Sequence, residues 1–414
     1  MKKSGKFYLL NGAGLLAAGL VWAQSTVIVD QRRAPERAVT IGVPPQGWAK
    51  ASLSRAMQVA RLVKDPKSNP EAPERRLAEE AFAAEPLATS ALPVLIQSIA
   101  ADGNLRDSER LLVLAGELTR RDNLINAMLI DEATKRHRPE QVVQLLGRAM
   151  SVDYEARYFY VDRLAAATAR PGAIEVLAPM LGQNPRWSID YWRTIIRIPE
   201  VLQQAGKIRL RISGPPWNRK RPTDTDFDLV AELVRRDYID LANQVARALG
   251  MSAPQEGELL MGSRFDRKSR FAPFEWELLQ TGDIGTTIEP EDHRLSISSL
   301  ASSSGIAARQ LSFVPAAGSY RLRWRLSGLG GNPDAALKFR LTCAEPKKIQ
   351  PFIAPILLKD GSASAPVSIA GSACNWYWVT LELDAAGSTV GTDIVIRELS
   401  LRREGKDTSV NPGI

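Results

Sequence analysis

Two hydrophobic patterns divide the chain. Between residues 48 and 251, apolar positions recur at i, i+3, i+4 and i+7, which is the spacing of amphipathic helices. The clearest pair of helices is expected at Phe227–Val234 and Tyr238–Leu249, with Thr223 or Asp224 as the N-cap of the first. Because only three residues separate these two segments, we expect them to pack as antiparallel neighbours.

A weak internal period runs through the helical region. The segments VVQLLGRAM, IEVLAPML and YIDLANQVARALG begin at Val142, Ile174 and Tyr238, which are 32 and 64 residues apart. Helix-pair repeats of about 34 residues stack into solenoids. We therefore predict an α-helical repeat domain over residues 49–252 that resembles tetratricopeptide-like repeats. Their Trp-x-x-Leu-Gly pattern is absent, so an irregular helical bundle is the alternative.

The pattern changes near Phe271 to short alternating runs separated by Gly, Ser, Asn and Pro, as in antiparallel sandwiches. This predicts an antiparallel, jelly-roll-like β-sandwich over residues 272–403, preceded by a basic linker over 253–271 and followed by a disordered tail over 404–414. The expected strands are Phe274–Thr281, Arg294–Leu300, Ala307–Val314, Tyr320–Leu326, Leu337–Cys343, Phe352–Leu358, Val367–Ala370, Trp376–Leu383 and Ile394–Leu401.

The N-terminal residues predict a targeting segment. Lys2, Lys3 and Lys6 precede Phe7–Val29, a mostly apolar run of 23 residues that is long enough to cross a hydrocarbon core of ~30 Å. Val21-Trp22-Ala23 also fits the small-residue rule of a signal-peptidase site. An uncleaved signal-anchor, a cleaved signal peptide and a buried N-terminal helix are the three interpretations.

The first two of these interpretations fix the compartment. Residues 1–29 are then a signal-anchor or signal peptide, and residues 30–48 are a linker. The rest of the chain is exported to the far side of the membrane. The protein is expected to be anchored in the inner membrane with periplasmic domains, or to be periplasmic or secreted after cleavage. We expect no nucleic-acid partner in that compartment.

Composition and charge exclude some classes of functional site. The 414 residues include 54 Lys and Arg, 46 Asp and Glu, two cysteines and two histidines, for a net charge of +8. So few cysteines and histidines exclude zinc fingers and multi-histidine metal sites, and we expect no cofactor. Residues 31–271 alone carry +7, from 37 basic and 30 acidic residues.

The basic excess is densest in Lys207–Pro222, which has six basic residues and no acidic one. A candidate anion-binding loop lies within it, formed by Trp217, Arg219, Lys220 and Arg221. Its ligand would be an anionic lipid headgroup, an acidic polysaccharide or a partner protein. A solvated, charged linker is the alternative.

The two cysteines are candidates for a disulfide. Cys343 ends one expected strand and Cys374 precedes another, in a compartment where disulfides persist. Closing this loop would stabilise the sandwich by about 3 kcal/mol. Two free buried thiols are the alternative, and no histidine lies near either cysteine in sequence to make it a nucleophile.

Aromatic and basic residues alternate along several expected strands. Trp376 and Trp378 share one face of their strand, where they could stack on sugar rings. The alternative is that they cover the second sheet or pack on the helical domain. If their strands are neighbours, five cations share one face and could bind carboxylates or phosphates: Arg321, Arg323, Arg325, Lys338 and Arg340. A solvated outer face, partly paired with acidic residues, is the alternative.

The sequence lacks the common catalytic motifs. It contains no G-x-S-x-G elbow, no H-E-x-x-H zinc helix and no G-x-x-x-x-G-K-[ST] loop, so we predict that the protein is not an enzyme. A glycosidase needs only two carboxylates, which leaves a polysaccharide-modifying hydrolase or lyase as an alternative.

The layout as a whole resembles envelope proteins of bacterial exopolysaccharide or O-antigen assembly. The C-terminal third is similar to carbohydrate-binding-module-like jelly rolls in PFEWEL (273–278), GSYRLRWRL (318–326), the two cysteine strands and IVIRELSL (394–401). The resemblance implies a non-catalytic envelope scaffold whose sandwich binds a polysaccharide or anionic glycan.

On this resemblance the helical repeats would bind an envelope protein partner, and the N-terminal segment would contact the membrane. A purely protein–protein scaffold of an envelope secretion complex is the alternative function.

Overall fold

The computed structural model describes residues 4–44, 46–152, 154–346, 348, 352–369 and 374–404, without the side chains of residues 4–14, 155 and 156. Contacts between residues divide the chain into two compact units. One unit comprises residues 1–164 with 185–187, and the other comprises residues 165–184 with 188–414. The predicted disordered tail lies outside the described residues from residue 405 onward.

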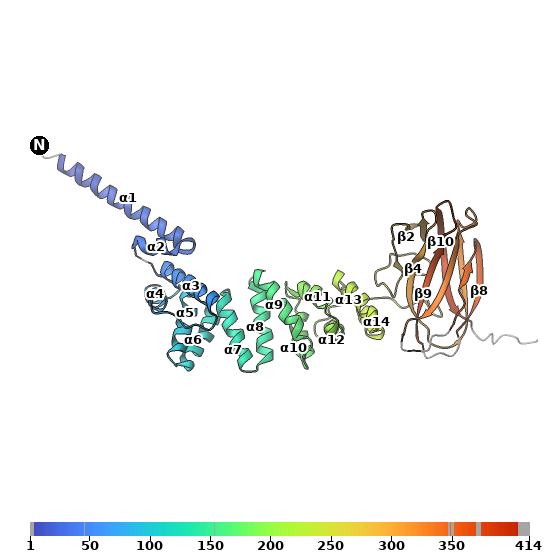
Figure 1. The fold of residues 1–414 in the computed structure, drawn as a ribbon, viewed down its shortest axis with the longest axis horizontal. Coiled ribbons are helices and arrows are strands. Elements are labelled where there is room, and N and C mark those ends of the chain that lie inside the picture. The colour runs from blue at the N-terminus through green and yellow to red at the C-terminus, as the bar shows by residue number, and fades with distance from the viewer. Residues whose placement is uncertain are drawn as a thin grey trace, which may run out of the picture. The chain divides into compact units, whose positions relative to one another are not determined.

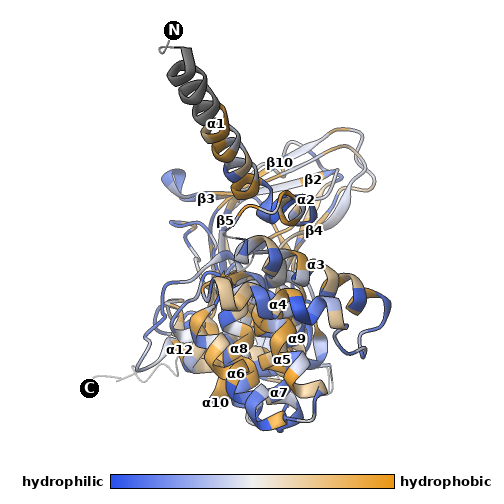
Figure 2. Ribbon diagram, turned by 90° about the vertical axis from the view of Figure 1, so that its left-hand side faces the viewer, coloured by the Kyte–Doolittle hydropathy of each residue, from blue (hydrophilic) through white to orange (hydrophobic). Residues whose placement is uncertain are grey.

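The first unit is helical. From α3 to α8, each helix packs against the next one in the chain, and α9 continues into the second unit. Figure 2 shows that α5, α6 and α8 carry both hydrophobic and hydrophilic residues, as amphipathic helices do. The helices are α1 (Ser4–Arg33), α2 (Pro35–Ile41), α3 (Gly47–Lys64), α4 (Ala72–Ala84), α5 (Leu92–Ala101), α6 (Leu105–Leu118), α7 (Asn123–Lys135), α8 (Pro139–Val152) and α9 (Tyr154–Ala167), with a 3₁₀ turn, η1 (Thr89–Ala91), before α5.

Side-chain caps explain where two of these helices begin. The Asn104 side chain accepts the backbone N–H of Asp107 at the start of α6, and Asp122 accepts two backbone N–H groups at the start of α7. Small side chains let the first helices approach closely, because one core cluster consists of Ala51, Ala78, Ala81, Ala88, Ala91 and Val94.

The apolar run Phe7–Val29 lies within α1. Among the helices of the described residues, none combines the length and the apolar character needed to cross a membrane.

The second unit begins with the end of α9 and five further helices: α10 (Ala173–Gly182), α11 (Ser188–Ile195), α12 (Leu202–Ser213), α13 (Asp224–Arg235) and α14 (Ile239–Ala248), with a 3₁₀ turn, η2 (Pro199–Val201), before α12. The predicted pair is confirmed, since α13 packs on α14 and Thr223 forms a capping box with Asp226. Asp226 also pairs with the buried Arg209 of α12. The tetratricopeptide-like repeat stays a prediction.

Two five-stranded antiparallel sheets follow these helices in the chain and are packed face to face, as Figure 1 shows. One sheet has the order β1-β4-β9-β6-β7 and the other β2-β3-β10-β5-β8, and residues from both build one hydrophobic core. The strands are β1 (Glu277–Leu278), β2 (Ile284–Glu289), β3 (Arg294–Ser299), β4 (Ser304–Phe313), β5 (Gly318–Ser327), β6 (Ala336–Cys343), β7 (Ile356–Leu358), β8 (Gly361–Ile369), β9 (Trp376–Asp384) and β10 (Thr392–Arg403), with a 3₁₀ turn, η3 (Pro290–Asp292), between β2 and β3.

The antiparallel sandwich is thus confirmed, with local differences. β2 lies where no strand was expected, and β7 covers only Ile356–Leu358 rather than the expected Phe352–Leu358. The first strand covers only Glu277–Leu278 rather than the expected Phe274–Thr281. The reason is that the buried Glu275 carboxylate accepts the backbone N–H groups of Arg270 and Phe271 and holds a turn before the strand.

The segment between α14 and β1 is fastened to the sandwich by Glu258. Its buried carboxylate accepts backbone N–H groups of Leu259 and Leu401 and the hydroxyl of Ser400, and it pairs with Arg402. These bonds fix the path of the chain beside β10, where it also lines the pocket described below.

Candidate functional site

The outer face of the sheet β1-β4-β9-β6-β7 carries most of the candidate chemistry. Tyr377, Val379, Leu381 and Leu383 of β9 point into the core, so the residues between them point outward. We call this surface the β9 face; its members are Glu277, Ile306, Arg309, Leu311, Phe313, Lys338, Arg340, Thr342, Leu357, Trp376, Trp378, Thr380, Glu382 and Asp384.

Trp378 lies in the middle strand of this sheet and is partly exposed. It is directly opposite Leu311 of β4 on one side and Thr342 of β6 on the other. The guanidinium carbon of Arg309 lies 4.6 Å from the centre of the indole ring, a cation–π contact. Trp378 is therefore an aromatic ring held in place on an accessible sheet face.

Three ion pairs lie on the same face as Trp378, between it and the Asp384 end of β9. Arg309 pairs with Glu277 at 2.6 Å, Arg340 with Glu382 at 2.8 Å and Lys338 with Asp384 at 2.9 Å. The six side chains are 31–45% exposed, so their polar atoms remain accessible to solvent and ligands. Each cation on the β9 face thus has an acidic partner, and the face is close to electrically neutral.

One of these carboxylates shows the effect of its partner on its pKa. The hydrogen bond from Lys338, with a second from Ser304, lowers the pKa of Asp384 below its ordinary value. Asp384 therefore stays ionised and paired at neutral pH.

Trp376 has a different environment, although it lies on the same face. It is 5% exposed, and its ring packs edge-on against Phe274 and Phe313. Its indole N–H donates to the Asp240 carboxylate of α14 at 2.9 Å. Of the two interpretations of Trp376, the structure therefore supports packing on a helix rather than an open stacking surface.

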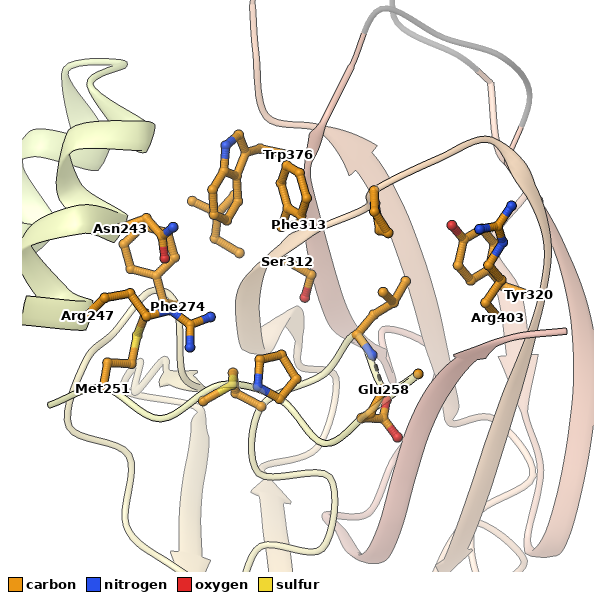
Figure 3. Close-up of a pocket in the computed structure, with 16 residues that line it drawn as sticks. Asn243, Arg247, Met251, Glu258, Phe274, Ser312, Phe313, Tyr320, Trp376 and Arg403 are labelled. Atoms are coloured by element: carbon orange, nitrogen blue, oxygen red, sulfur yellow. Dashed lines mark hydrogen bonds between the residues drawn. The ribbon is translucent and has the colours of Figure 1, made fainter. Parts of the chain in front are cut away.

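A pocket of about 320 Å³ adjoins this contact. Figure 3 shows Asn243 and Arg247 on its α14 side and Trp376 and Phe313 on its sandwich side. Its lining is mostly apolar; the other residues that line it are Met251, Pro254, Gly257, Glu258, Leu259, Met261, Phe274, Leu311, Ser312, Pro315, Tyr320 and Arg403.

The expectation that five cations share one face is wrong. Arg321, Arg323 and Arg325 lie on β5, whereas Lys338 and Arg340 lie on β6, and these strands belong to different sheets. The segment after β5 crosses to the opposite sheet instead of forming a hairpin. Arg321 pairs with Glu404, and Arg325 lies 3.7 Å from Glu398, in line with the alternative of a paired outer face.

The candidate anion-binding loop is well anchored at Trp217. This ring packs against Gly182 of α10 so closely that a side chain at position 182 would clash with it. The backbone carbonyl of Arg219 accepts a hydrogen bond from Arg209. Lys220 and Arg221 are exposed and Arg219 is partly exposed. The assignment of an anion to this loop stays a prediction.

The disulfide between Cys343 and Cys374 is confirmed, with Cα atoms 6.0 Å apart. It joins the end of β6 to the residues just before β9. The Glu345 carboxylate lies beside it and accepts the backbone N–H groups of Asn375 and Trp376. Because both sulfur atoms are bonded to each other, they are not available as metal ligands.

Several residues of the site were not predicted from the sequence. Glu277 and Arg309 come from β1 and β4, and Asp240, Asn243 and Arg247 come from α14. The alternation within each strand indicates which residues point outward. Only the order of the strands in the sheet shows that these side chains meet.

The sequence matches no protein-family model and no curated protein. Among solved structures, the arabinose-bound α-L-arabinofuranosidase MgGH51 is 17% identical, with a TM-score of 0.25 over 35% of this chain and 26% of that one. TmCBM61 in complex with β-1,4-galactotriose is 14% identical, with a TM-score of 0.25 over 36% of this chain and 99% of that one. This chain therefore spans about a quarter of the arabinofuranosidase. These low values show neither a family nor a function.

Proposed function

We propose that the protein binds a polysaccharide on the β9 face and acts as a non-catalytic scaffold in a bacterial envelope. The observation that carries this proposal is the partly exposed Trp378, which is held by Arg309 and lies next to paired polar side chains. An aromatic ring suits the apolar face of a sugar, and planar guanidinium and carboxylate groups suit its hydroxyls.

The ion pairs support binding rather than catalysis. A glycosidase needs one carboxylic acid with a raised pKa to protonate the leaving group. On the β9 face Glu277, Glu382 and Asp384 are each paired with a cation, and the pKa of Asp384 is lowered instead. The face therefore suits recognition of an intact glycan.

A purely protein–protein scaffold is the second candidate, and one observation in the first unit favours it. Val113, Leu114 and Leu118 of α6 are 50–55% exposed and lie within two turns of the helix. Exposed apolar clusters of this kind are typical of protein interaction sites. In this second candidate, α6 binds an envelope protein.

The proposed location rests on the disulfide bond. The Cys343–Cys374 disulfide supports an oxidising compartment such as the periplasm or the cell exterior. In that location the protein would meet polysaccharide during its assembly or export.

A glycan array tests the proposal with the full chain. We expect the native protein to bind at least one bacterial polysaccharide and Trp378→Ala to lose that signal. Arg325→Ala is the matched control because Arg325 lies on the other sheet. Absence of glycan binding by the native protein, or equal binding by Trp378→Ala, would contradict the proposal.

The purely protein–protein scaffold has its own test. A protein that co-purifies with the native chain but not with Leu114→Asp would support that function.

A further inference from the structure

The pocket at one end of the β9 face suggests which sugar completes the site. We infer that this pocket holds an acidic sugar unit, a uronate, of the glycan that the β9 face binds; the inference rests on the proposed function. It is carried by the position of the pocket, its aromatic walls and the charge of Arg247.

The position of the pocket follows from strand register. Leu311 is directly opposite Trp378 and also lines the pocket, and Phe313 is directly opposite Trp376. Two residues of an extended strand separate these rows, which is about 7 Å. A glycan that stacks on Trp378 and runs along β9 therefore brings a neighbouring unit to the pocket.

The walls of the pocket suit a sugar ring. Phe274, Phe313 and Trp376 form an aromatic cluster with ring centres 5.2–5.4 Å apart. The indole N–H of Trp376 is already bound by Asp240, so its ring has a fixed orientation. A volume of about 320 Å³ is at the small end of ligand pockets, which suits one sugar unit better than a longer segment.

The charge of the pocket differs from that of the β9 face. Arg247 donates to the backbone carbonyl of Ser252 and has further N–H groups. The only carboxylate among the lining residues is Glu258, which is buried and already bound by backbone N–H groups, Ser400 and Arg402. Arg247 is thus free to bind a carboxylate in a bidentate manner, and the Asn243 amide can bind an adjacent hydroxyl.

A matched pair of ligands tests the inference with the full chain. The probes are a glucose trisaccharide and the same trisaccharide whose terminal unit is oxidised to glucuronic acid, each titrated by calorimetry. We expect the acidic probe to bind about tenfold more tightly, and Arg247→Gln to abolish that preference so that the two probes bind with similar affinity. Arg236→Gln is the control, because Arg236 pairs with Glu232 away from the lining residues.

The outcomes separate the two proposals. Equal affinities for the two probes, or an acid preference that survives in Arg247→Gln, overturns the inference but leaves glycan binding on the β9 face in place. If neither probe binds and the glycan array is also negative, the proposed function fails and the inference fails with it.

Discussion

Trp376 and Trp378 show how two identical side chains on one strand acquire different roles. Trp376 is buried by Phe274, Phe313 and α14, and its N–H is bound by Asp240. Trp378 remains partly exposed beneath Arg309. We therefore expect substitutions at Trp376 to change stability first, and substitutions at Trp378 to change binding first.

Trp376→Phe tests the first role. Phenylalanine keeps most of the apolar contact but removes the N–H, which leaves the Asp240 carboxylate without this donor. Hydrogen bonds to charged groups contribute about 1.5–3 kcal/mol, so we expect a loss of this order in the free energy of unfolding in urea. Trp378→Phe is the control and should cost less. Effects of Trp376→Phe and Asp240→Asn that simply add would show that the two residues are not coupled.

The buried Tyr191 should make the stability of the fold sensitive to alkaline pH. Burial raises the pKa of its phenol, and the hydrogen bond with Thr168 only partly opposes this. The unfolded chain ionises this group near pH ~10, so it binds fewer protons than the folded chain above that pH and stability falls. Tyr191→Phe should be less stable by about 1 kcal/mol near neutral pH, from the lost hydrogen bond with Thr168. This difference should shrink between about pH 9 and about pH 11 in urea unfolding. A constant difference would be inconsistent with the raised pKa.

At the scale of elements, the disulfide links two neighbouring strands of one sheet of the sandwich. Cys343 ends β6 and Cys374 precedes β9, and these strands are paired along their length. Closing a loop of this length stabilises a fold by about 3 kcal/mol in the chain-entropy model. We therefore expect the double variant Cys343→Ser, Cys374→Ser to lose about this much in urea unfolding. An unchanged free energy of unfolding in the double variant would contradict a stabilising role of the disulfide.

The strands also show what could be predicted from sequence and what could not. Alternation identified the outward side chains of β5, β6 and β9, and the spacing of turns gave nearly every strand. The same alternation does not state which sheet a strand joins. The chain passes from β5 in one sheet to β6 in the other, so Arg323 and Arg340 are separated by the core.

At the scale of the whole molecule, the positive charge is concentrated before the sandwich, at Lys207–Pro222. The β9 face by contrast has each of its cations paired with an acid. A neutral glycan on such a face should bind with little dependence on ionic strength. We expect its Kd to change less than about twofold between about 50 mM and about 500 mM salt. A steep weakening of the neutral glycan's binding with salt would contradict this account of the β9 face.

Calorimetric titration of the array-identified glycan into the full chain and three variants tests the central claim most directly. The account predicts that Trp378→Ala weakens binding at least about tenfold, that Arg340→Ala weakens it less, and that Arg325→Ala leaves it unchanged. Unaltered affinity in Trp378→Ala, or a loss in Arg325→Ala as large as in Trp378→Ala, would contradict glycan binding on the β9 face.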